Sequence, residues 1–93
     1  MKYFLTVILS DKATPAKKKS FGEKIEKLIK VFEGKVEKID DWGEIALEHK
    51  IKGHTSGNFL HFALELERSR GGSLRERLVT EEDILRYLLV RAK

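Results

Sequence analysis

The sequence predicts an α+β fold whose elements follow the order strand, helix, strand, strand, helix, strand. An apolar run rich in β-branched and aromatic residues opens the chain at residues 3–9, and a second one closes it at residues 84–91. Between them, one stretch has the apolar spacing of a helix and two stretches alternate apolar with polar residues. A chain of 93 residues suffices for one domain with a modest core, and we expect this domain to span residues 1–93.

The first strand, residues 3–9, carries apolar side chains on both of its faces. Leu5 and Val7 alternate with Phe4 and Ile8. Because successive side chains of a strand point to opposite faces, both faces of this strand need apolar neighbours. We therefore place it in the middle of the sheet.

A helix follows, and its ends are marked in the sequence. Thr14 suits the N-cap and Pro15 the first helical position. Gly34 occupies the place of a C-terminal glycine cap. Between these residues, apolar side chains recur at spacings of four, three and four and form one stripe, which comprises Phe21, Ile25, Leu28 and Phe32, with Ile29 beside it.

The second and third strands are predicted at residues 35–52 and 58–67. The pair Trp42-Gly43 indicates a bulge or bend within the second strand, and residues 53–57 have the composition of a loop. In the third strand, apolar residues alternate with a second set that includes His61. We predict that the core contains Val7, Leu28, Leu60, Phe62 and Leu64.

A short second helix and a last strand complete the chain. Gly71 and Gly72 interrupt the pattern, and Ser73 and Glu76 have the spacing of a capping box, so the helix is predicted to begin at Ser73. Residues 80–83 form a turn and residues 84–91 the final strand. The side chains expected to face inward from these two elements are Leu74, Leu78, Ile84, Tyr87 and Leu89.

With right-handed crossovers, this order gives a ferredoxin-like βαββαβ fold, a four-stranded antiparallel sheet with two helices on one face. The opposite face is then bare, and it carries Phe4, Ile8, Phe59, His61, Leu88 and Val90. Such an apolar surface is larger than an isolated domain usually exposes to water. It is a candidate platform for RNA or for a protein. Lys2 and Arg86 lie on the two terminal strands, and we expect their charges to converge beside it.

Composition narrows the classes of partner only slightly. The chain has 19 basic and 15 acidic residues and a net charge of +4, which suits a nucleic-acid partner but also an ordinary solvated surface. The absence of cysteine excludes disulfides and thiolate chemistry and fits a reducing cytosol. The first apolar run is short and lacks a small-residue cleavage site, so we expect neither a signal peptide nor a membrane partner.

The sequence offers no catalytic or metal-binding arrangement. His49, His54 and His61 lack the spacing of metal ligands, and there is no cysteine to complete a site. Gly71-Gly72 lacks the lysine and hydroxyl of a phosphate-binding loop. We therefore predict a protein that is not an enzyme and has no cofactor, metal or small-molecule substrate.

Five short motifs occur in the order typical of one protein family. They are Lys2-Tyr3, the Gly34–Ile39 segment, Trp42-Gly43, the Gly57–Phe62 segment and the closing strand Asp83–Arg91. This ordered set resembles the bacterial small-subunit ribosomal protein S6 family over nearly the whole chain. The resemblance implies a ferredoxin-like fold, no catalysis and a place in the cytoplasmic ribosome. It also implies binding to the central domain of small-subunit rRNA beside ribosomal protein S18.

The resemblance also suggests residues that contact RNA. At matching positions, Lys2, Arg86 and Arg91 would face RNA, and Phe4, Phe59 and His61 would lie on the sheet face where part of the contact is made. The second strand departs from the family pattern, because Glu44, Ile45, Ala46 and Glu48 replace basic or small residues. The two glutamates would oppose a phosphate on that strand.

Two other functions fit the same residues. The chain could be a protein–protein interaction or dimerisation module, a divergent or engineered relative that uses the apolar sheet face. It could also bind single-stranded RNA in the manner of an RNA-recognition motif, with Phe4 and Phe59 as stacking residues. The glycine and aromatic pattern of that motif is missing around Phe59, so this reading ranks last.

Overall fold

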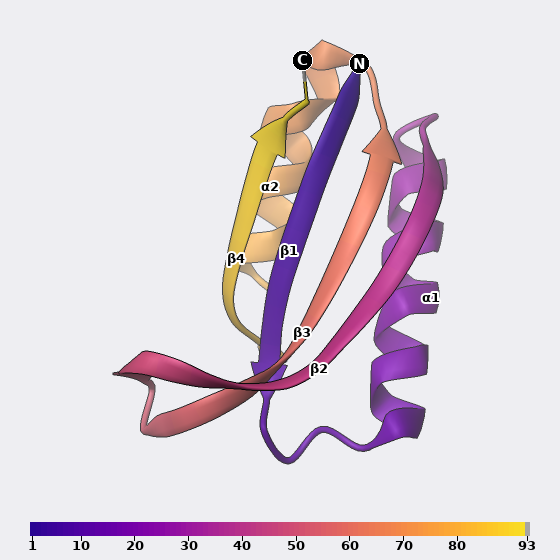
Figure 1. Cartoon of the computed structure of the whole chain (residues 1–93). Coiled ribbons are helices and arrows are strands. Elements are labelled where there is room, and N and C mark those ends of the chain that lie inside the picture. Colours follow the sequence, from indigo (N-terminus) through magenta and orange to yellow (C-terminus); the bar gives the residue numbers. More distant parts are fainter. Residues whose placement is uncertain (93) are drawn as a thin grey trace.

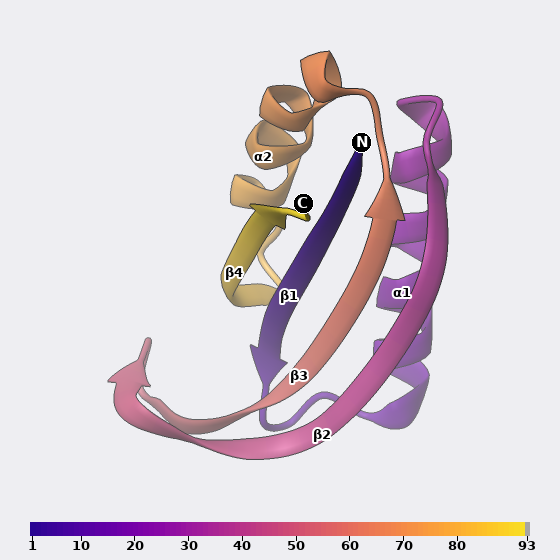
Figure 2. The same cartoon turned by 45° about the horizontal axis from the view of Figure 1, so that its top comes forward.

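The structure is a computed structural model that describes residues 1–92, and it forms one curved antiparallel sheet with two α-helices on a single face (Figure 1). The elements are β1 (Lys2–Ser10), α1 (Pro15–Val31), β2 (Lys35–Ile51), β3 (His54–Glu65), the short 3₁₀ helix η1 (Arg68–Arg70), α2 (Gly71–Val79) and β4 (Ile84–Arg91). The strand order is β2-β3-β1-β4. The predicted ferredoxin-like βαββαβ fold is confirmed, and the tilted view shows both helices on the same side of the sheet (Figure 2).

The core lies between the sheet and the two helices. Val7, Leu60, Phe62 and Leu64 are buried, as predicted. Leu28 is only half-buried, and that part of the prediction is wrong. The buried stripe of α1 advances by exactly four residues at a time, through Phe21, Ile25 and Ile29, so Leu28 falls at its margin.

Gly34 is required by packing and not by the left-handed cap that the sequence predicts. The left-handed residue is Glu33, with φ of 62°. The Gly34 N–H donates to the Ile29 carbonyl at 2.9 Å and the Glu33 N–H to the Lys30 carbonyl at 2.9 Å, which is the pattern of a Schellman motif. A side chain on Gly34 would collide with the Glu65 carbonyl oxygen. Glycine is therefore fixed here by the close approach of β3.

The β2–β3 hairpin extends further than predicted, because residues 54–57 belong to β3 and not to a loop. The connection is the pair Lys52-Gly53, whose φ values of 49° and 84° suit a two-residue hairpin turn. The hairpin projects past the end of β1 and bends across the sheet (Figures 1 and 2). His54 Nδ1 lies 3.0 Å from Asp11 Oδ1, which ties the hairpin to the loop after β1. This hydrogen bond holds the pKa of Asp11 below its usual value.

Helix α2 begins at Gly71, two residues before the predicted start at Ser73. Gly71 is buried against the Tyr3 ring, and a Cβ at this position would lie 3.2 Å from the Tyr3 hydroxyl. The N-cap residue Arg70 makes no side-chain capping hydrogen bond, and the expected capping role of Ser73 is wrong. Packing on β1 sets the start of the helix, while Leu74 and Leu78 are buried as predicted.

The acidic turn between α2 and β4 is held by lysines of α1. Lys17 Nζ lies 3.1 Å from Asp83 Oδ1, and Lys24 Nζ lies 2.7 Å from Glu81 Oε2. These pairs join α1 to the turn that follows α2. Part of the lysine content of α1 is therefore used within the fold and is not available to a partner.

The end of α1 offers a paired stability test. We expect Gly34→Ala to destabilise the protein by about 1–3 kcal/mol, because the added methyl group must displace the β3 backbone. Glu33→Gly should instead stabilise it by about 0.5–1 kcal/mol, since glycine relieves a left-handed backbone. Urea unfolding of both variants measures these changes. A Gly34→Ala variant as stable as the parent would contradict the packing argument.

Candidate nucleic-acid and protein interface

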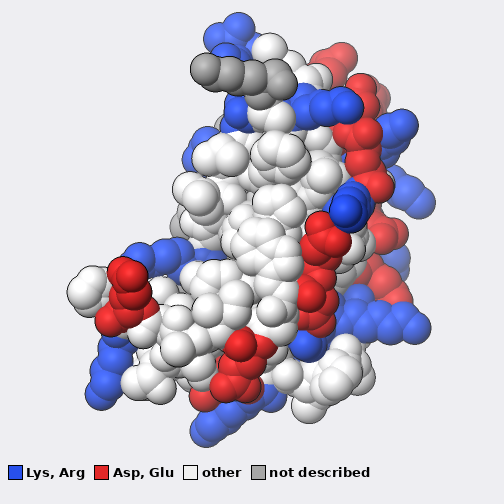
Figure 3. Space-filling view, viewed as in Figure 1, with Lys and Arg blue, Asp and Glu red and all other residues white. Residues whose placement is uncertain are grey.

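The face of the sheet opposite the helices is the candidate interface. The strand register and the burial of alternate residues place on it Phe4, Thr6 and Ile8 of β1, Phe59, His61 and Ala63 of β3, and Arg86, Leu88 and Val90 of β4. The predicted apolar set therefore shares one face. Phe4, Leu88 and Val90 are 41%, 61% and 43% exposed. Figure 3 shows a broad white band along the middle of the molecule. We call the sheet face opposite the helices the open face.

Three aromatic rings form a stack across the open face, and one of them, Trp42, is absent from the sequence-based set. The Trp42 and His61 ring centroids are 4.8 Å apart with the planes 11° from parallel. Phe4 stacks on His61 with centroids 5.4 Å apart. Thr6 Oγ1 lies 3.0 Å from His61 Nδ1 and orients the imidazole. The rings come from β2, β3 and β1, so the stack crosses three strands.

Trp42 reaches this stack from β2 at the position of a bulge. The pairing of β2 with β3 shifts between Asp41 and Gly43, and Gly43 has φ of 77°. Asp41 Oδ1 accepts a hydrogen bond from the Gly43 N–H at 2.7 Å, and its other oxygen lies 2.9 Å from Lys18 Nζ. The sequence marks the bulge through Trp42-Gly43. The signal that could have found Trp42 is strand alternation, because Trp42 lies two residues after Asp40, which pairs with His61 of the open face.

The predicted RNA-contacting cations do not all lie together. Arg86 pairs with Ile8, whereas Lys2 lies beside Ala92 at the other end of β1. Six residues of strand separate the two positions, which corresponds to about 20 Å. The expected convergence of Lys2 and Arg86 is therefore wrong. Lys2 instead shares the end of the sheet with Arg91, and its ammonium lies 3.8 Å from Glu37 Oε2.

Acidic side chains border the open face on the β2 side, where Figure 3 shows red atoms along the white band. Asp40 lies 3.8 Å from Lys38, and Glu44 accepts a hydrogen bond from the Ser56 hydroxyl at 3.1 Å. This border would repel a phosphate backbone. That β2 opposes a phosphate stays a prediction.

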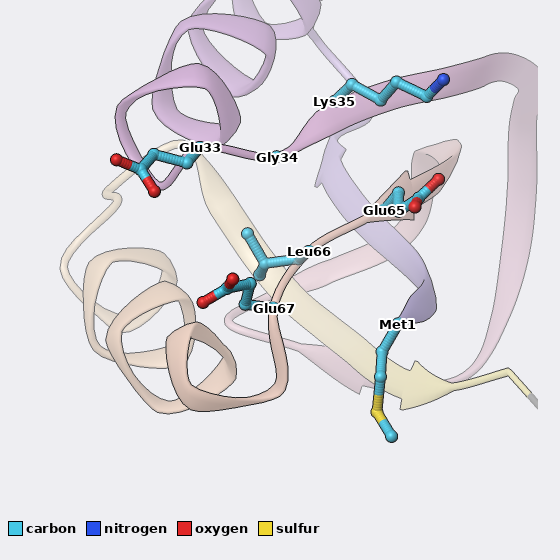
Figure 4. A pocket seen from close by; sticks show the side chains of 7 residues that line it. All are labelled: Met1, Glu33, Gly34, Lys35, Glu65, Leu66 and Glu67. Carbon is cyan, nitrogen blue, oxygen red and sulfur yellow. The ribbon is translucent and has the colours of Figure 1, made fainter.

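A shallow pocket of about 390 Å³ lies where α1 ends and β3 leaves the sheet (Figure 4). Glu33, Glu65 and Glu67 line it with Lys35. The carboxylates of Glu33 and Glu67 extend to one side of the view, and that of Glu65 extends to the other. They do not converge on a common point. Within residues 1–92, no group of three or more potential metal ligands comes together.

Neither α-helix in the described part of the chain has the length and apolar character that a membrane crossing requires.

The Lys18–Asp41 pair should make stability depend on acidity. The Lys18 hydrogen bond, aided by the Gly43 N–H, holds the pKa of Asp41 below its usual value. The unfolded chain then binds more protons at acidic pH, so the contribution of Asp41 is present above about pH 4 and is lost as pH falls through the lower folded value. We expect the wild type to be more stable than Asp41→Asn near neutral pH, with the difference shrinking near about pH 3. Urea midpoints at both pH values measure this, and an unchanged difference would contradict it.

Comparison with known proteins gives a consistent result. The family model described as ribosomal protein S6 matches residues 2–91. The small ribosomal subunit protein bS6 of Pelagibacter ubique is 28% identical over 91 residues, covering 98% of this chain and 75% of the relative. The protein of the same name from Alkaliphilus metalliredigens is 28% identical over 92 residues, covering 97% and 95%. The crystal structure of 30S ribosomal protein S6 from Thermotoga maritima has a TM-score of 0.89 at 17% identity, with 98% and 86% covered, and shares the fold.

Proposed function

This chain belongs to the ribosomal protein S6 family, a family of small-subunit components of the cytoplasmic ribosome, and we propose that it binds the central domain of small-subunit rRNA beside ribosomal protein S18. The observation that carries the proposal is the family match over residues 2–91, supported by an open sheet face that two helices leave uncovered. The family consists of ribosomal structural proteins and is not known for enzymes. The proposed role is accordingly one of assembly and not of catalysis.

The RNA contact in this proposal involves Lys2, Arg86 and Arg91 as phosphate ligands. The two arginines are exposed, and within residues 1–92 neither takes part in an ion pair. The pair between Lys2 and Glu37 is long and exposed, so a phosphate can replace the carboxylate at little cost. The neighbouring rings of Phe4, Phe59 and His61 offer a surface for stacking or packing.

The S18 contact in this proposal is the apolar part of the open face. Leu88 and Val90 of β4 and Trp42 of β2 are 61%, 43% and 49% exposed, and a partner would remove this surface from water. The acidic border along β2 favours a protein over a phosphate backbone on this part of the face. The same exposed residues support the second candidate function, in which the face binds another copy of the chain.

The RNA contact can be tested by replacing Lys2 and Arg86 together with alanine. We expect weaker binding to an rRNA central-domain fragment and a salt dependence reduced by about one ion per lost phosphate contact. The control is Lys27→Ala/Lys30→Ala, which removes two exposed charges from α1 on the covered side of the sheet. Fluorescence anisotropy over a salt series measures both. Loss of binding in the control alone would contradict the chosen surface.

The S18 contact can be tested with Leu88→Asp, which places a charge in the middle of the apolar surface. Because Leu88 is 61% exposed, the fold should tolerate the change, while affinity for S18 should fall by roughly tenfold or more. Val31→Asp is the matched control, since Val31 is 70% exposed on α1. Calorimetric titration with S18 separates the two variants. If Leu88→Asp binds S18 normally but abolishes self-association, the dimerisation function replaces the S18 contact.

A further inference from the structure

The two kinds of basic residue are segregated along this chain. All six arginines lie between residues 68 and 91, and every lysine apart from Lys93 lies between residues 2 and 52. The arginines therefore fall on η1, α2 and β4, which are consecutive in sequence and adjacent at one side of the molecule (Figures 1 and 2). A guanidinium group binds phosphate well, because its planar set of donors can form two hydrogen bonds at once. The side of the molecule that carries the arginines is therefore a candidate phosphate-binding surface.

The arginines also differ from the lysines in their partners. The described residues form ion pairs through Lys2, Lys17, Lys18, Lys24 and Lys38, and His54 lies against Asp11, whereas no arginine of residues 1–92 takes part. Arg68, Arg75, Arg86 and Arg91 are exposed. We call these four residues the arginine edge. Arg70 is half-buried, and Arg77 lines the groove between α1 and α2 beside Glu81, so neither is included.

Arg75 and Arg86 of the arginine edge border the free side of β4, whereas the Arg91 guanidinium donates to Met1 Sδ at 3.8 Å. The Ala92 N–H donates to the Lys2 carbonyl, so the backbone groups of Ala92 point toward β1. The direction of the backbone groups alternates from one residue to the next along a strand, so those of Leu89, three residues earlier, point away from the sheet. Arg75 confirms this direction, because its Nη2 donates to the Leu89 carbonyl at 3.1 Å. Arg75 approaches this border from the helix side, and Arg86 stands on the open-face side. Guanidinium groups therefore flank both sides of β4.

We propose that the arginine edge is a binding surface for an RNA phosphate backbone, which runs along the outer border of β4 beside the apolar part of the open face. This inference deepens the proposed function and rests on it. Arg75 on α2 and Arg68 on η1 thereby join the proposed RNA contacts, although neither lies on the sheet face. In Figure 3, blue atoms appear on the β4 flank and at the end with the termini.

The chemistry of the border favours phosphate over an added β-strand. A pairing strand needs acceptors as well as donors along the edge, but the Leu89 carbonyl in the middle of β4 is already bonded to Arg75. The outward backbone N–H groups and the four guanidinium groups are donors. A phosphate backbone offers only acceptors and negative charge, so it matches this surface.

The test is the double variant Arg68→Gln/Arg75→Gln, which spares Lys2, Arg86 and Arg91. Glutamine at position 75 keeps an amide that can donate to the Leu89 carbonyl. We expect binding to the rRNA central-domain fragment to weaken about tenfold or more, and the slope of log affinity against log salt to fall by about two. Arg68→Lys/Arg75→Lys should restore the slope, and Lys27→Gln/Lys30→Gln should stay within about twofold of wild type.

The outcomes separate this inference from the function on which it rests. If wild type binds the fragment but the glutamine variant binds within about twofold of it, the arginine edge is overturned and the proposed function stands. If wild type does not bind the fragment at any salt concentration, both are overturned. If Arg75→Ala, which frees the Leu89 carbonyl, forms dimers in sedimentation without losing RNA affinity, the edge serves strand pairing and the inference is also overturned.

Discussion

The rest of the structure depends on one constraint: two helices cover only one face of a four-stranded sheet. The central strands β1 and β3 carry apolar side chains on both faces, with Leu5 and Val7 toward the helices and Phe4 and Ile8 away from them. The covered face builds the core and provides stability. The open face retains aromatic and aliphatic groups in contact with water. Burial of these groups against a partner is favourable through the hydrophobic effect. The fold therefore produces a binding surface as a consequence of its own topology.

On the remaining surface, the lysines and the arginines differ in whether they form ion pairs within the fold. Lysines of α1 form ion pairs with Asp41, Glu81 and Asp83, and so hold the bulge and the acidic turn in place. The arginines of η1, α2 and β4 have no such partners in the described part of the chain. The net charge of +4 does not reveal this difference, because it sums over the whole chain. The border along β2 is acidic, whereas the border along β4 is rich in hydrogen-bond donors. In this account, one small domain can bind RNA and a protein on different surfaces.

Much of the fold follows from short-range patterns in the sequence, because the two-residue period of strands assigns faces locally. Leu60 and Phe62 on one face and Phe59 and His61 on the other were predictable for this reason. Features that depend on tertiary contacts were not. The start of α2 is set by Gly71 against Tyr3, and the glycine at position 34 by the β3 backbone. The strand register separated Lys2 from Arg86.

We propose that RNA phosphates contact the arginine edge, whereas the protein partner covers Trp42, Leu88 and Val90. The most direct measurement is NMR of ¹⁵N-labelled protein titrated separately with an rRNA central-domain fragment and with S18. The account predicts that RNA shifts the amide and guanidinium signals of Arg68, Arg75, Arg86 and Arg91, whereas S18 shifts the Trp42 indole and the amides of Leu88 and Val90. Shifts from both partners on the same residues, or RNA shifts confined to α1, would contradict it.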